Sequence, residues 1–107
     1  MSTKVRIDPG VCGFICNVEA ITEDGMNCKL VIHSGCEPIA HLTKANGDTF
    51  NAYDICLAKP GKGAIYEYAS EHFPSHCCCP VPAGIIKAME AECQLALKKD
   101  ASIVFRD

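Results

Sequence analysis

Alternating apolar and polar residues mark three strands in the first third of the chain. Residues 3–8, 13–22 and 26–33 each carry apolar or small side chains at every second position, which is the period of a half-buried strand. The second and third of these segments are joined through Asp24-Gly25, and an Asp-Gly pair is a strong hairpin signal. We therefore expect a β-meander near the N-terminus.

The period changes to that of a helix after the third strand. Ser34 and Glu37 fit a capping box, and Asn46-Gly47 is a typical helix end. Residues 64–73 show helical spacing, so they predict a further helix. The clearest helix comes last, with apolar side chains at every fourth position. These are Ile85, Met89, Cys93 and Leu97.

Two other segments complete the predicted architecture. Residues 49–58 are ambiguous and fit a short helix from Asn51, whereas residues 101–106 fit a closing strand. This order predicts an α+β fold, in which a small antiparallel or mixed sheet, made of the N-terminal β-meander plus a C-terminal strand, is covered on one face by three to four helices. We expect residues 1–107 to form a single domain.

Composition and charge narrow the classes of function. A net charge of -3 and scattered lysines give no basic stripe, so we expect no nucleic-acid partner and no electrostatic membrane anchor. The N-terminus lacks an apolar signal region and no long apolar run could span a membrane, which predicts a cytoplasmic protein. Nine cysteines in a reducing compartment indicate metal ligands or redox groups rather than disulfides, and an odd number cannot pair completely.

Four of the nine cysteines fit the predicted core. Cys16 and Cys28 lie on the inward faces of strands, Cys93 lies in the apolar stripe of the last helix, and Cys56 receives the same interpretation. The other five fall in turns or at helix starts, where packing explains them less well. They are Cys12, Cys36, Cys77, Cys78 and Cys79.

Strand pairing and helix position single out three of these five thiols. The hairpin brings Cys12 and Cys36 to the same end of the sheet, because the start of one strand lies beside the end of the next. Cys36 and Cys79 each precede a helix start that contains proline, where the helix dipole is expected to lower a thiol pKa. Cys79 joins the same end if the closing strand at residues 101–106 returns toward it.

The convergence predicts a metal centre bound through Cys12, Cys36 and Cys79, holding Zn²⁺ or an iron–sulfur cluster. The fourth ligand is left open among Cys78, Cys77 and His76. The remaining histidines lie at the edges of regular elements and are interpreted as surface or core residues. They are His33, His41 and His72.

Two resemblances bear on these residues. Cys79-Pro80-Val81-Pro82, followed by a helix and a strand, resembles the Cys-Pro-x-Pro motif of TusA-type sulfur carriers, and this resemblance implies a persulfide on Cys79. It favours a second hypothesis, a sulfur-carrier or thiol-redox protein in which Cys12 or Cys36 resolves the persulfide. A third interpretation is a non-enzymatic module that binds a protein partner and has structural cysteines; enzymatic activity and oligomeric state are left open.

The whole chain is similar to a family of small uncharacterised proteins found mainly in anaerobic microbes. Three motifs support the similarity, and it implies that Cys12, Cys36, His76 and Cys79 belong together without assigning an activity. The motifs are Cys12-Gly13-Phe14, Ser34-Gly35-Cys36 and His76-Cys77-Cys78-Cys79-Pro80-Val81-Pro82.

Overall fold

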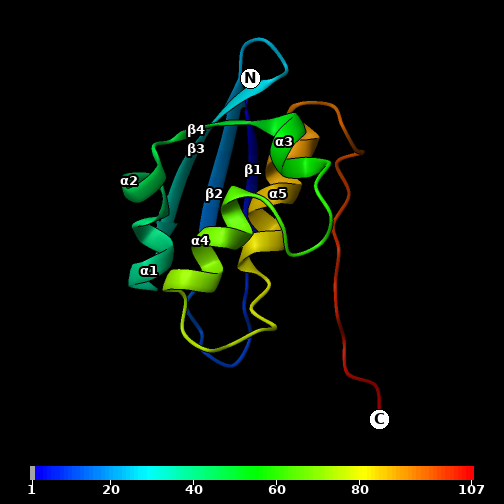
Figure 1. Ribbon diagram of the computed structural model, residues 1–107. Coiled ribbons are helices and arrows are strands. Elements are labelled where there is room, and N and C mark those ends of the chain that lie inside the picture. The colour runs from blue at the N-terminus through cyan, green and yellow to red at the C-terminus, as the bar shows by residue number, and fades with distance from the viewer. Residues whose placement is uncertain (1) are drawn as a thin grey trace.

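Four antiparallel strands form one sheet in the order β1-β2-β3-β4 in the computed structural model, which describes residues 2–107 (Figure 1). Neighbouring strands in the sheet are also neighbours in sequence, so the whole sheet is a meander. All three strands predicted near the N-terminus, and the hairpin between the second and third, are confirmed. The strands are β1 (Thr3–Ile7), β2 (Cys16–Thr22), β3 (Asn27–Ser34) and β4 (Thr49–Asn51).

The hairpin between β2 and β3 is closed by the side chain of Asp24. Its Oδ1 atom accepts the backbone N–H groups of Met26 and Asn27, both at 2.8 Å, and its Oδ2 atom accepts the Asn27 side-chain amide at 2.8 Å. These bonds favour the ionised carboxylate and hold the pKa of Asp24 well below its usual range. The Asp-Gly signal in the sequence therefore has a clear physical basis in this turn.

Five short helices accompany the sheet. The first two are one predicted helix interrupted at His41, and α3 begins at its N-cap Asn51, as the sequence predicted. The predicted capping box is wrong, because the N-cap of α1 is Cys36 and the Ser34 hydroxyl accepts the Cys36 N–H at 3.1 Å instead. The helices are α1 (Glu37–Ala40), α2 (Leu42–Asn46), α3 (Ala52–Cys56), α4 (Ala64–His72) and α5 (Val81–Glu92).

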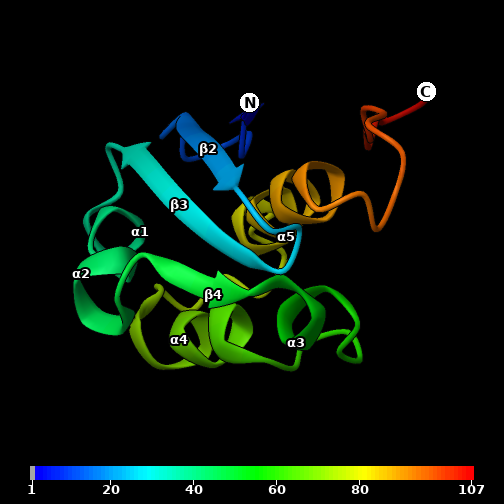
Figure 2. The same ribbon diagram turned by 90° about the horizontal axis from the view of Figure 1, so that it is seen from above.

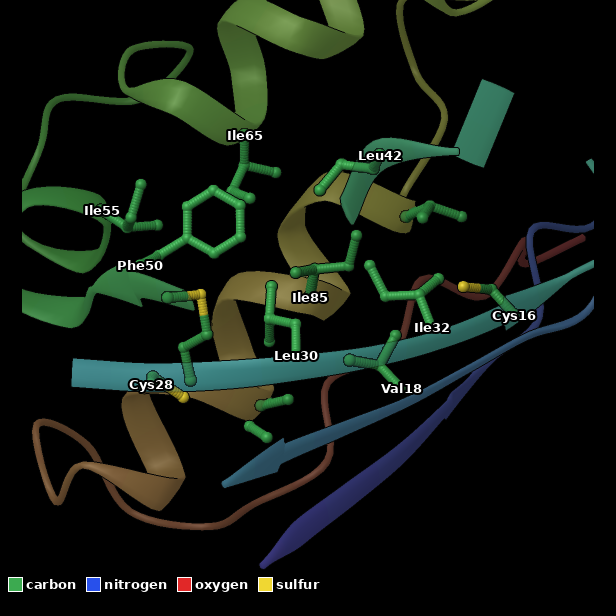
Figure 3. Packing of buried hydrophobic residues seen from close by; sticks show 14 of the residues in the cluster. Cys16, Val18, Cys28, Leu30, Ile32, Leu42, Phe50, Ile55, Ile65 and Ile85 are labelled. Carbon is green, nitrogen blue, oxygen red and sulfur yellow. The ribbon is translucent and has the colours of Figure 1, made fainter. Parts of the chain in front are cut away.

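The helices lie against one face of the sheet, which confirms the predicted α+β class (Figure 2). α5 packs on β1 and β2, α1 and α2 lie against β3, and α3 and α4 pack on α5. The core fills the space between these layers, with Cys16 and Cys28 at opposite ends of it (Figure 3). The other face of the sheet is solvated and carries exposed polar side chains. These are Lys4, Arg6, Asn17 and His33.

Two contacts fix how α5 lies along the sheet. At its first turn, Gly84 packs so closely on β1 that a methyl group there would stand 2.4 Å from Cδ1 of Ile7. At its last turn, the Glu92 carboxylate accepts the Thr3 hydroxyl at 2.9 Å and the Thr22 N–H at 3.1 Å. The helix therefore begins beside the end of β1 and finishes beside its start.

The predicted C-terminal strand is not formed. Helix α5 ends at Glu92 with Gln94 at φ 59°, and the Leu95 and Gln94 N–H groups donate to the carbonyls of Glu90 and Ala91, which is a Schellman motif. The apolar spacing therefore outlasts the helix, and Leu97 is 89% exposed instead of buried. Residues 97–107 run alongside α5 without joining the sheet, and β4 supplies the fourth strand instead (Figure 1).

A candidate thiol site at one end of the sheet

Three loops gather at the end of the sheet where β1 finishes (Figure 1). They are residues 8–15, 35–36 and 73–80. Strand pairing places Ile7 opposite Cys16 and Cys16 opposite Ser34, so the first two loops leave the sheet side by side. The contact between Gly84 and Ile7 brings the start of α5, and with it the third loop, to the same end.

The N-terminal loop also contacts the loop before α1 directly. A methyl group on Gly35 would stand 3.0 Å from Cδ1 of Phe14, so the Phe14 ring covers the backbone at Gly35. Cys12 lies two residues before this ring and is exposed, whereas Cys36 lies one residue after Gly35 and is half-buried. The expected proximity of the Cys12 and Cys36 loops is therefore present.

Cys36 lies at the start of α1, near Tyr68 of α4. It is the N-cap residue of α1, and the hydroxyl of Tyr68 in α4 donates to the carbonyl of Pro38 at 2.7 Å. Burial raises the pKa of Tyr68, and the charge of the nearby Cys36 raises it further. Tyr68 is thus a neighbour of the thiol site, which no motif in the sequence indicated.

Cys79 is half-buried just before α5, with its N–H donating to the carbonyl of His76 at 3.1 Å. Burial raises the pKa of its thiol, the Val81 N–H lowers it in part, and nearby thiols raise it again. The expected lowering of the Cys79 pKa is therefore wrong, because desolvation outweighs the helix start. The neighbouring thiols that act on Cys79 are Cys12, Cys36 and Cys78.

These effects define a group of thiols, which we call the thiol pole: Cys12, Cys36, Cys78 and Cys79. Charge effects fall off with distance, so the influence of the other three on Cys79 places each of them near Cys79. Cys16 lies beneath them in the core, and burial, together with the charges of Cys79 and Cys36, raises its pKa to about 11.

The remaining predicted ligands lie in the same loop as Cys78. His76 and Cys77 are both exposed, and Nε2 of His76 is 3.5 Å from Sγ of Cys78. No three His, Cys, Asp or Glu side chains among residues 2–107 already surround a common metal position. The structure therefore gathers the predicted residues at one end without holding them at ligand distances.

A second group of thiols lies at the opposite end of the core. Cys28 shares a hydrogen bond with Cys93, and burial with the charge of Cys93 raises its pKa to about 12. Burial also raises the pKa of Cys56, to about 11, and its Sγ is 3.9 Å from the carbonyl of Ile86. The predicted burial of Cys28 and Cys93 is confirmed, but their pairing was missed. It follows only from the direction of α5, which brings its last turn to the start of β3.

Fold and site together define a small α+β protein that gathers thiols from three loops at one end of its sheet. The chain belongs to the family of unknown function DUF6951, whose family model matches residues 3–105. No curated protein and no solved structure matches the chain. Within residues 2–107, none of the helices has the length and apolar character that crossing a membrane requires.

Proposed function

We propose that the thiol pole binds a metal centre, either Zn²⁺ or an iron–sulfur cluster, through Cys12, Cys36 and Cys79. The observation that carries the proposal is the gathering of these thiols from three separate segments of the chain at one end of the sheet. Thiolates are the ligands that both kinds of centre use, and four of them complete a tetrahedral site.

Cys78 is the best fourth ligand of the three candidates. Its charge acts on Cys79, so its thiol lies within the thiol pole. His76 contacts Cys78 and is better placed to orient it than to replace it, and Cys77 is exposed on the same loop. A side chain that orients a metal ligand through a hydrogen bond commonly tunes the ligand's basicity.

Binding requires the exposed thiols to close onto the half-buried ones. Cys12 and Cys78 are exposed on loops, whereas Cys36 and Cys79 are anchored at helix starts and packed against the core. Gathered thiolates repel one another, and the positive charge of a bound cation would offset that repulsion and favour the deprotonated form of the thiols it coordinates. Two anchored ligands and two exposed loop ligands would thus form the site as the metal enters.

Metal analysis of protein purified without oxygen tests the proposal. We expect stoichiometric zinc, or iron and sulfide with visible absorption, and we expect loss of the metal in Cys36→Ala and Cys79→Ala. Cys56→Ala is the matched control, because Cys56 is also half-buried but lies with the second thiol group. Comparison of Cys77→Ser with Cys78→Ser identifies the fourth ligand. Protein that carries neither metal nor absorption, and does not take up added Zn²⁺, would contradict the proposal.

A second candidate function is sulfur transfer by Cys79 in a reducing compartment such as the cytoplasm. The Val81 N–H lowers the pKa of the Cys79 thiol in part, so the Cys-Pro-Val-Pro turn offers a donor to a sulfur at this position. A donor persulfide would pass its outer sulfur to the Cys79 thiolate, forming the Cys79 persulfide and leaving the donor as a thiolate. Mass spectrometry after incubation with a small-molecule persulfide should show one added sulfur on Cys79; full transfer by Cys79→Ser would reject this function.

A further inference from the structure

The C-terminal segment, residues 101–106, has the composition of a strand but no strand partner. Ile103 is 93% exposed, Val104 73% and Phe105 98%. β-branched and aromatic residues favour strands because they pack on a pleated surface, and here they have no surface to cover. Large apolar side chains exposed next to one another usually mark an interaction site.

The sheet offers a free edge of matching length. β1 is the first strand in the sheet order, so within residues 2–107 one side of its backbone has no strand beside it. It has five residues, whereas the other edge strand, β4, has three and continues directly into α3. Val5 in the middle of β1 is packed on the core but only half-buried, so this edge still has apolar surface to cover.

The C-terminal segment is not paired with the β1 edge of its own chain. It runs alongside α5, apart from the sheet (Figure 1). A strand extends by about 3.3 Å per residue, so residues 101–106 would span about 20 Å, which is enough to lie along the five residues of β1 in a second copy.

We infer that residues 101–106 of one copy pair as an additional strand with the β1 edge of a second copy, so that two chains exchange their C-terminal segments. Each segment would bury on the order of 400 Å² of its own apolar side chains and cover a similar area of its partner. Two reciprocal contacts then total on the order of 1,600 Å², which is the area of a standard stable interface. This inference does not depend on the proposed metal site.

Light scattering of the full chain across a range of concentrations tests the exchange. The full chain should have the mass of a dimer, and a chain shortened by residues 101–107 should have the mass of a monomer. The double variant Ile103→Asp/Phe105→Asp should weaken the dimer at least about a hundredfold, because two apolar side chains lose their burial. The control is Val11→Asp, which adds one such negative charge at an apolar residue that is 104% exposed, outside the segment.

Hydrogen exchange then locates the contact. Amides of residues 101–106 and of β1 should be protected in the full chain, and β1 should lose part of that protection in the shortened chain while β2 and β3 keep theirs. Circular dichroism of each variant shows that it is folded. A full chain that stays monomeric at every concentration overturns the inference, as does a dimer that survives removal of residues 101–107.

Discussion

The contact between Gly84 and Ile7 makes Gly84→Ala a sharp test of how α5 is positioned. The new methyl group would stand 2.4 Å from Cδ1 and 2.5 Å from Cγ1 of Ile7, and Ile7 is only 8% exposed, so its side chain has little room to turn away. Overpacking of this kind costs about 1–3 kcal/mol, whereas alanine is about 1 kcal/mol better than glycine within a helix. We expect a net loss of about 1 kcal/mol, which lowers the melting temperature by about 5 °C.

A double-mutant cycle separates the steric cost from the gain in helix propensity. Ile7→Ala alone should cost about 2–5 kcal/mol, but in the Gly84→Ala background the new methyl group fills part of the space left by Ile7. The double variant should therefore be at least about 1 kcal/mol more stable than the sum of the single effects predicts. Ala83→Gly, at an exposed position of the same helix, measures the propensity difference alone. Additive effects in urea unfolding, or a stabilised Gly84→Ala, would refute this reasoning.

Three other predictions concern the turn, the last helical turn and the buried thiols. Glu92→Ala should lower the unfolding free energy by about 1–3 kcal/mol in urea, since it removes both hydrogen bonds that tie α5 to the sheet. The pKa of Asp24 is lower in the folded protein than in the unfolded chain, where it is about 3.9. The ionised Asp24 therefore stabilises the fold above that pH, and this stabilisation is lost as the pH falls further. Wild type should thus lose its advantage in melting temperature over Asp24→Asn between about pH 5 and pH 2; an unchanged difference would contradict this. Iodoacetamide at neutral pH should label the exposed thiol of Cys77 rapidly. It should label Cys28, which is buried and has a pKa of about 12, only when the protein unfolds, and peptide mass spectrometry measures both reactions.

The parts of the fold that the sequence predicts well are those with a strong local signal. The Asp24-Gly25 turn and the alternation on both sides of it yield β2, β3 and the hairpin between them. The apolar stripe of α5 likewise predicts a buried helix, and it correctly places Cys93 in the core. From the hairpin alone, Cys12 and Cys36 could be assigned to one end of the sheet.

The parts of the fold that the sequence predicts poorly depend on contacts with residues far away in the chain. β4 has only three residues, and its pairing with β3 defines it better than its own pattern does. Residues 101–106 have a strand pattern, but a strand exists only where another strand is available. Leu97 continues the period of α5, yet the backbone at Gln94 ends the helix first.

The thiol site shows the same division between local and distant causes. The helix start before Val81 is visible in the sequence, but the desolvation of Cys79 depends on how the loops pack around it. The sequence also gave no sign that Tyr68 reaches the carbonyl of Pro38 beside Cys36. The positions of the cysteines along the chain were therefore enough to predict which thiols belong to the site, whereas their pKa values depend on the tertiary structure.

Helix α5 keeps the two groups of thiols chemically insulated from each other. Its 12 residues extend about 18 Å between the turn that carries Cys79 and the turn that carries Cys93. A disulfide needs Cα atoms within about 7 Å, so neither sulfur nor electrons can pass between these cysteines by thiol exchange while the helix is intact. Oxidation at the exposed end of the molecule would thus stop there, and the buried thiols at the other end would be spared.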